Sequence, residues 1–312
     1  MDRGRRRTLL IAAAAGALIA AGAPPLLVEM RWLAEGQGRL DQLARRPGEC
    51  LRPPADAALA RSVETGRAAF RTPLLLGGPA ARAGLSCDSC HRDGRGNPAF
   101  LFPGVSGAPG TADVTTSLFS SHRGNGADDP VPIPDLSGPK AGLKVSQDPT
   151  KPDLERFIAG LVVEEFNGHP PPPAVLRGLA DYVRALDPDL CPEEDRPATA
   201  EALLDDADRA VVAALTSLSA GDPATALVMI AAARSSLGRI AERYAGLTLG
   251  PAALARSDRA LAAAAEAVRA AGPDGAARLA AWRAERPRLA EALAREADRS
   301  LFNPARLAAL AR

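Results

Sequence analysis

Several residue types are scarce in this sequence, and each shortage excludes a class of protein. Aromatic residues make up only 4% of the 312 residues, so the core must be built mainly from Ala, Leu and Val. Four cysteines are too few for a disulfide-dense scaffold. The 38 basic and 37 acidic side chains leave a formal charge of +1, which argues against a nucleic-acid-binding protein, because such proteins usually carry a basic excess. What remains is a globular chain of two-domain length.

The rarest reactive side chains are concentrated in one part of the chain. All three histidines and all four cysteines lie between residues 50 and 191, and this part also carries an excess of acidic residues. The sequence after residue 199 is rich in Ala, Leu and Arg and contains neither Cys nor His. Metal or redox chemistry is therefore expected in the middle of the chain.

The first 28 residues have the layout of an export signal. Residues 1–7 (MDRGRRR) are strongly basic, and residues 9–28 are apolar and uncharged. Small residues at 21–23 offer a cleavage point, but Pro24 follows them directly, and the apolar run is long enough for an uncleaved membrane anchor. The sequence predicts a periplasmic protein, either soluble after cleavage or tethered to the inner membrane through residues 9–28.

The remaining sequence predicts an all-α protein in several segments. These are a connector over 29–49, a unit over 50–191, a linker over 192–199 and an Ala-rich helical bundle over 200–312. Within the unit, apolar spacing predicts helices over 56–70, from a Thr150 cap to about 159 with Gly160 as a stop, and over 174–186. Residues 92–150 are dense in Gly, Pro, Ser and Asp, and long irregular loops are expected there.

The strongest chemical signal lies in residues 87–91 (CDSCH), which match the C-x-x-C-H attachment pattern of a c-type haem. Two thiols three positions apart can each bond one vinyl group of the same porphyrin, and the adjacent histidine then lies under the iron. Cys87 and Cys90 are therefore predicted to anchor one covalent haem c, with His91 as its proximal ligand. A redox dithiol, a zinc site and a plain disulfide are the alternatives, but neither a βαβ pattern nor a second C-x-x-C pair accompanies the motif.

Three further stretches resemble a known family. Residues 66–70 (GRAAF) and 85–91 (LSCDSCH), with the Gly-rich stretch that follows, resemble a single haem domain of the di-haem cytochrome c peroxidase family. Residues 176–186 (LRGLADYVRAL) are similar to the C-terminal helix of soluble cytochromes c. The resemblance covers about residues 58–190 and implies a cytochrome c-like helical fold around one haem, with the first and last helices crossing. Only one C-x-x-C-H is present, so a second, peroxidatic haem is not encoded.

The distal iron ligand departs from the family pattern. Soluble cytochromes c usually supply a methionine shortly before the last helix, whereas none of the three methionines here lies in the haem unit. His169, within residues 167–170 (NGHP), stands at the equivalent place and is the expected sixth ligand. His122, in the Gly-rich loop, is the alternative distal ligand, and an open site is the third possibility.

The identity of this ligand decides the function. Two strong axial ligands leave no place for peroxide or oxygen, so the iron can only change valence, at a lower potential than with a methionine ligand. This favours a non-enzymatic periplasmic cytochrome that carries single electrons between redox partner proteins, which would dock at the haem edge or on the C-terminal bundle. An open distal face, with His122 and Arg123 nearby as acid or base, would instead indicate a peroxidase-like enzyme.

Cys50 and Cys191 bracket the predicted haem unit. One precedes its first helix and the other follows its last, so the two meet if those helices pack together. An exported protein permits a disulfide between them. The alternative is two unpaired thiols.

Aromatic side chains are assigned by their place in the chain. Phe100, Phe102 and Phe119 follow the C-x-x-C-H motif and are expected to cover the haem, because an apolar shell limits water access and tunes the potential. Trp282 and Tyr244 lie in the predicted bundle, where they are expected in the core.

Overall fold

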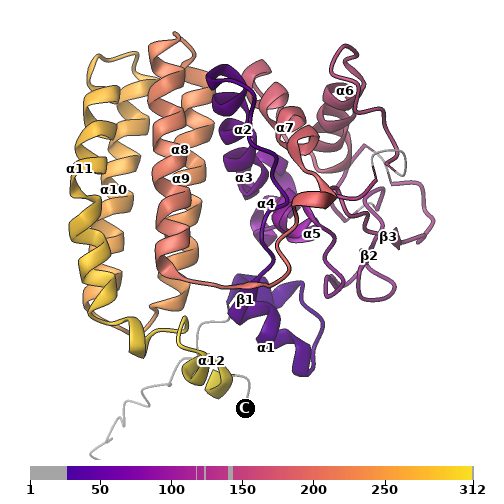
Figure 1. Cartoon of the computed structure of the whole chain (residues 1–312), viewed down its shortest axis with the longest axis horizontal. Coiled ribbons are helices and arrows are strands. Elements are labelled where there is room, and N and C mark those ends of the chain that lie inside the picture. Colours follow the sequence, from indigo (N-terminus) through magenta and orange to yellow (C-terminus); the bar gives the residue numbers. More distant parts are fainter. Residues whose placement is uncertain (1–26, 117, 123, 140–142, 311–312) are drawn as a thin grey trace, which may run out of the picture.

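The computed structural model describes residues 27–116, 118–122, 124–139 and 143–310. The export signal or membrane anchor expected over residues 1–28 therefore lies outside the described residues, apart from its last two positions. The structure is mostly helical, with 59% helix and 4% strand, which confirms the expected all-α class. Figure 1 shows long helices grouped on one side of the molecule and shorter helices with irregular loops on the other.

The segment before the first long helix packs against the rest of the chain. Its elements are η1 (Val28–Arg31), α1 (Gln37–Ala44) and β1 (Arg45–Arg46). Strand β1 pairs antiparallel with β4 (Arg196–Pro197), so the segments expected as connector (29–49) and linker (192–199) lie side by side. Leu33 is buried and forms a bridge to Phe100. Both segments thus help to close the fold around the middle of the chain.

Short helices and long loops make up residues 50–191. Their helical elements are α2 (Ala57–Phe70), α3 (Pro73–Leu76), α4 (Gly78–Ala83), α5 (Cys87–Cys90), η2 (Arg92–Gly94), α6 (Asp153–Gly160), the π-helical turn η4 (Leu161–Glu165), α7 (Pro173–Ala185) and η5 (Pro188–Leu190). Strands β2 (Thr111–Ala112) and β3 (Val131–Pro132) pair antiparallel inside the loop region. Asp56 caps α2 by accepting hydrogen bonds from two backbone N–H groups of its first turn. The predicted helices over 56–70 and 174–186 therefore form as α2 and α7.

The predicted start of α6 is wrong, whereas its predicted end agrees with the structure. Thr150 does not cap this helix, because its N–H and its hydroxyl both donate to Asp148 Oδ1, and Pro152 occupies the N-cap position. The α-helix ends at Gly160, and the chain continues directly into η4, a turn that the sequence pattern does not predict and in which Val162 is buried in the core.

Helices α2 and α7 pack against each other at two glycines. A Cβ atom on Gly66 would lie 1.8 Å from the carbonyl oxygen of Gly178, and one on Gly178 would lie 2.7 Å from the backbone nitrogen of Gly66. A disulfide joins Cys50 and Cys191, which confirms the predicted bridge. Asp187 also donates its backbone N–H to the Cys50 carbonyl at 2.7 Å. The two ends of the unit are thereby held together.

Long Ala-rich helices form the C-terminal part of the molecule. The elements are α8 (Ala200–Ser219), α9 (Pro223–Arg243), α10 (Leu249–Arg269), α11 (Asp274–Ala294), η6 (Ala297–Arg299) and α12 (Pro304–Leu310). Tyr244 and Trp282 are buried, as expected for residues of the bundle core. Within the described part of the chain, α9 alone is long and apolar enough to span a membrane, but half of its apolar window is buried inside the protein. It packs as a core helix, and α8 and α9 form the face that contacts α2.

Candidate functional site

The C-x-x-C-H motif folds as a single helical turn, α5. Ser86 caps this turn, and its backbone N–H donates to Ser89 Oγ at 3.1 Å. The His91 N–H donates to the Cys87 carbonyl at 2.8 Å, which ends the turn at the histidine. Because residues three apart are neighbours on a helix surface, the turn places the thiols of Cys87 and Cys90 side by side. Both are free and partly exposed.

The two thiols are unlike those of a redox dithiol. Although both residues keep some exposed surface, desolvation of their thiols by the surrounding fold raises the pKa of Cys87 and of Cys90 to about 12, so both stay protonated at neutral pH. Reactive dithiols instead have lowered pKa values. Among the described residues there is no group of three or more His, Cys, Asp or Glu side chains that could hold a metal ion.

The His91 imidazole is oriented by the backbone. Its Nδ1 lies 3.0 Å from the carbonyl oxygen of Pro134, to which it donates. Burial lowers the pKa of His91, and this hydrogen bond opposes the shift only in part, so the neutral ring is favoured. With the proton on Nδ1, the Nε2 lone pair is free to bind a metal, the arrangement usual for a ligating histidine.

The two candidate distal ligands lie on exposed loops. His169 is exposed between η4 and α7, just after Gly168, whose Cβ would lie 2.7 Å from the Leu75 carbonyl oxygen. This loop is therefore pressed against α3. His122 is also exposed, in the loop after Phe119. Neither side chain contacts His91 in the described part of the protein. The identity of the sixth iron ligand therefore stays a prediction. Arg123, the expected neighbour of His122, lies outside the described residues.

Aromatic residues after the motif form a small cluster. Phe100 and Phe119 are buried. The Phe119 ring lies 5.4 Å from that of Phe102 and 5.6 Å from that of Phe166, measured between centroids. The cluster supplies an apolar wall in this part of the fold, and its contact with a haem stays a prediction.

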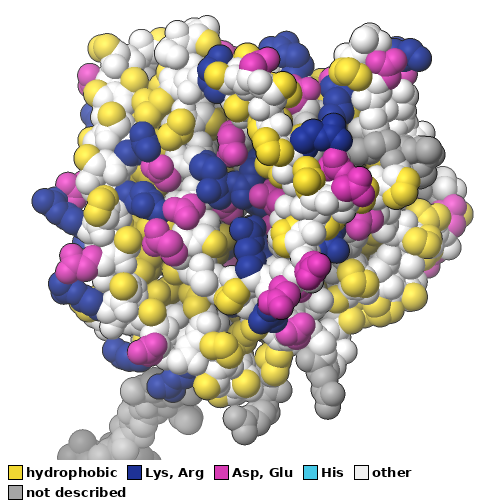
Figure 2. Space-filling model, viewed as in Figure 1, with side chains coloured by type: hydrophobic (Ala, Val, Ile, Leu, Met, Phe, Trp, Pro, Cys, Tyr) yellow, Lys and Arg dark blue, Asp and Glu magenta, His cyan; other side chains and the backbone are white. Residues whose placement is uncertain are grey.

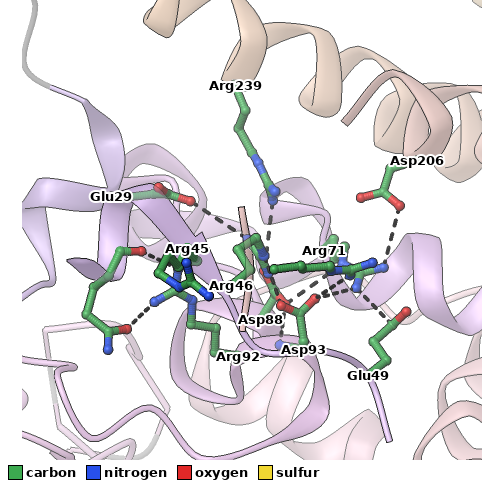
Figure 3. Close-up of polar contacts among 12 residues, drawn as sticks. Glu29, Arg45, Arg46, Glu49, Arg71, Asp88, Arg92, Asp93, Asp206 and Arg239 are labelled. Carbon is green, nitrogen blue, oxygen red and sulfur yellow. Dashed lines mark hydrogen bonds and ion pairs between the residues drawn. The ribbon is translucent and has the colours of Figure 1, made fainter. Parts of the chain in front are cut away.

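A buried ionic network lies behind the motif, and no local sequence spacing indicates it. Arg46 lies 2.7 Å from Asp88 and 2.9 Å from Asp93. Arg71 lies 2.7 Å from Asp93 and 2.8 Å from Glu49 (Figure 3). Asp88 is one of the two residues between the cysteines, so the motif itself is part of this network. Arg67 on α2 and Arg71 at its C-cap lie four residues apart, but this spacing does not indicate which acids they meet.

Asp93 holds the backbone just after the motif in an unusual conformation. Its φ of 52° and ψ of 35° are left-handed, which is rare for a residue other than glycine. Its N–H donates to Asp88 Oδ1 at 2.9 Å, and its carboxylate binds Arg46 and Arg71. Although burial opposes ionisation, these two guanidinium groups hold the pKa of Asp93 well below its usual range. The ion pairs therefore stabilise the turn that follows His91.

The network also joins the motif to the bundle. Asp206 of α8 lies 3.2 Å from Arg67. Arg243 of α9 lies 3.2 Å from Glu29 and donates to the Leu43 carbonyl at 2.8 Å. The C-x-x-C-H segment is thus fixed on one side by charges that come from the N-terminal segment, α2 and the bundle together.

Comparisons with known proteins add no assignment. No protein-family model matches the sequence, and no curated protein or solved structure is significantly similar to it. The functional argument therefore depends on the residues of the site.

Proposed function

We propose that this chain is a mono-haem c-type cytochrome that carries single electrons. The observation that carries the proposal is the motif itself. Cys87 and Cys90 are free, protonated thiols on one helical turn, and His91 follows them with Nδ1 occupied by a carbonyl and Nε2 available. A covalent haem c requires these three groups from the protein, and the residues present fit it.

Each residue then has a defined task. Cys87 and Cys90 would hold the porphyrin through two thioether bonds, each made by addition of an S–H across a vinyl group. His91 would offer its Nε2 lone pair to the iron, and its Nδ1–H···O bond to Pro134 would fix the ring plane and raise its basicity. The haem, when bound, supplies the Fe(III)/Fe(II) couple.

The packing around the motif supports a cytochrome c-like fold for residues 50–191. The resemblance implies that the first and last helices of the unit pack together, and α2 and α7 do so at Gly66 and Gly178. The disulfide between Cys50 and Cys191 is in line with export to an oxidising compartment such as the periplasm. Redox partner proteins would dock at the haem edge or on the C-terminal bundle.

His169 is the proposed distal ligand, and a peroxidase-like enzyme with an open iron is the second candidate. The second candidate is favoured by one observation, the exposure of both His169 and His122 on loops. The ferric spectrum separates the two. A low-spin spectrum that does not change with cyanide supports the electron carrier. A high-spin spectrum that changes quickly with cyanide or peroxide supports the enzyme.

Haem attachment is tested by expression in a host with working cytochrome c maturation machinery. The purified protein is expected to be coloured and to keep its pigment in acidified acetone. The double variant Cys87→Ser, Cys90→Ser should lose the pigment to acetone or be colourless. The matched control is Cys50→Ser, Cys191→Ser, which removes the other cysteine pair and should keep the haem bound. A colourless or extractable wild-type protein would overturn the proposal.

A further inference from the structure

A cavity of about 380 Å³ lies between the back of the C-x-x-C-H segment, the N-terminal segment and helices α8 and α9. Its lining includes Ser86 and Asp88 from the motif region, Val28 from η1 and Arg239 from α9. Figure 2 shows basic side chains, with acidic ones beside them, gathered along this boundary at the centre of the face. The volume falls in the range of roughly 300–1,000 Å³ that small-molecule sites occupy.

The walls of this cavity carry more positive than negative groups. Eight arginines and six acidic residues line it. One of those acids, Asp205, is neutralised from outside the lining by Arg286. The innermost acids, Asp88 and Asp93, are already engaged by Arg46 and Arg71. On the bundle side, the wall carries three arginines, Arg209, Arg239 and Arg243, against two acids, Asp206 and Glu242, that are not neutralised from outside the lining.

Arg239 is the arginine with the weakest pairing on this side. It extends from α9 toward the motif (Figure 3), and its Nη1 lies 3.9 Å from Asp88 Oδ2, beyond hydrogen-bond distance. Its Nε is buried without a hydrogen-bond partner. Arg209, on the neighbouring helix α8, also has a buried Nε without a hydrogen-bond partner, although its Nη2 donates to Asp206 and its Nε lies 3.7 Å from Glu64. Buried donors without partners are costly, so two guanidinium groups here can gain from an added acceptor.

The cavity also has an apolar part. Trp32, Leu43 and Phe302 line it together with the arginines. A guanidinium group binds a carboxylate or a phosphate through two parallel hydrogen bonds. Apolar and aromatic walls suit the carbon part of an organic molecule.

We propose that this cavity binds a small organic anion through a carboxylate or phosphate group, with Arg239 and Arg209 as the residues that hold the anionic end. The ligand site lies behind α5, on the side where Asp88 faces the bundle. It goes beyond the proposed electron carriage and requires no bound haem, so a failure of one proposal leaves the other standing.

The test is calorimetric titration of the purified protein with succinate and, separately, with inorganic phosphate, each compared with sodium chloride at equal ionic strength. Saturable binding of either anion beyond the chloride response is expected. Succinate alone would assign an organic carboxylate and phosphate alone a phosphate group. A response equal to that of chloride for both anions would overturn the proposal.

Substitution locates the site. Arg239→Gln should weaken binding by about tenfold or more, the size expected when a charge-assisted hydrogen bond is lost. Arg234→Gln is the matched control, because Arg234 lies on the same helix, is 42% exposed and pairs with Asp258 instead. If Arg239→Gln fails to fold, Arg209→Gln replaces it, since the Arg209 side chain is 38% exposed. Wild-type affinity in a folded Arg239→Gln or Arg209→Gln protein would place the anion elsewhere and overturn the assignment.

Discussion

At the residue scale, the C-x-x-C-H segment is held in place by residues other than its cysteines and histidine. These are Asp88, between the two cysteines, and Asp93, just after His91. Asp88 would be an arbitrary spacer if the motif only had to hold two cysteines at the right separation. In the structure it accepts a hydrogen bond from the Asp93 N–H and pairs with Arg46. The motif is therefore held from behind by charges, while its thiols and imidazole remain available for the proposed haem.

Loss of one buried charge should reveal this support. Asp93→Asn leaves Arg46 and Arg71 without their shared partner, while asparagine still tolerates the left-handed backbone. Breaking a buried ion pair from one side costs about 3–5 kcal/mol. The free energy of unfolding, measured in urea, should be lower in the variant by about this amount.

The control for this change is Asp258→Asn, which removes the partner of Arg234 in a surface pair. Its cost should be at most about 1 kcal/mol. Equal losses for the two variants would mean that the buried network contributes no more than a surface contact.

The distal ligand gives a second prediction at this scale, one that depends on the proposed haem. His169→Ala should convert the low-spin ferric spectrum to a high-spin one, because the sixth position is vacated. His122→Ala is the matched control and should keep the low-spin spectrum. Loss of low-spin character in the His122 variant alone would assign the ligand to His122.

Some contacts of single residues could be predicted from the sequence and others could not. The pairing of Cys50 with Cys191 could be predicted because the two positions bracket the helices of one unit, and the structure confirms it. The ionic network could not be predicted, because Arg46 meets Asp88 and Asp93 only after the N-terminal segment has packed behind the motif. Haem attachment remains a prediction from the spacing of the motif.

At the element scale, the contact between α2 and α7 is set by two residues without side chains. Gly66 and Gly178 allow backbone atoms of the two helices to touch, and Cβ atoms at either position would collide with backbone that cannot move aside. Sequence periodicity predicted both helices, since their apolar spacing is regular. It could not predict the start of α6, because Thr150 bonds to Asp148 instead of capping the helix, nor the π-helical turn η4 that follows Gly160.

Gly66→Ala should therefore separate the two helices. Overpacking of a tight contact costs typically about 1–3 kcal/mol, and the cost should reach or exceed the upper value here because the clash is with backbone. Chemical denaturation of the purified variant measures this loss.

Gly160→Ala serves as its control, because a Cβ atom there meets nothing within 4 Å. In a helical segment this change should be neutral or stabilise by up to about 1 kcal/mol. A Gly66→Ala protein as stable as the Gly160→Ala protein would show that the helices do not depend on this close approach.

At the scale of the whole molecule, distant segments close the structure in two places. The disulfide joins Cys50 to Cys191 across 141 positions, and strands β1 and β4 pair beside the boundary with the bundle. The residues on the two sides of that boundary are far apart in sequence, so no local pattern could predict how the bundle would pack. Charge pairing across it, between Asp206 and Arg67 for example, links the stability of the two parts.

Removal of the disulfide should weaken the whole fold. Because the bridge closes a loop of 141 positions, the chain-entropy model assigns it about 5 kcal/mol. The variant Cys50→Ser, Cys191→Ser should lose that amount in urea unfolding under non-reducing conditions. Wild-type protein treated with reductant should approach the same value, and an unchanged midpoint in both cases would contradict the prediction.

Acid should destabilise the boundary between the motif segment and the bundle. Burial alone would raise the pKa of Glu49, but Arg71 and Arg67 lower it from the ordinary 4.5 to about 2. The pKa of Glu29 is likewise lowered to about 2. Burial alone would raise it, but the charge of Arg243 contributes most to lowering it. A carboxylate with a lowered folded-state pKa stabilises the protein fully above its ordinary value, and this contribution is lost as the pH falls from about 4.5 to about 2. For Glu49 the amount is about 3 kcal/mol, from 1.36 kcal/mol per pKa unit.

The free energy of unfolding is measured in urea at pH 7 and at pH 3. It should fall more between these two pH values in the wild type than in Glu49→Gln, because the variant has no carboxylate to protonate at position 49. The variant should be less stable than the wild type at pH 7, because Arg67 and Arg71 lose a partner, and the gap should narrow toward pH 3. Glu266→Gln, in an exposed pair with Arg269, should follow the wild type at both pH values. A pH dependence in the Glu49 variant as steep as in the wild type would mean that the acid sensitivity arises outside this network.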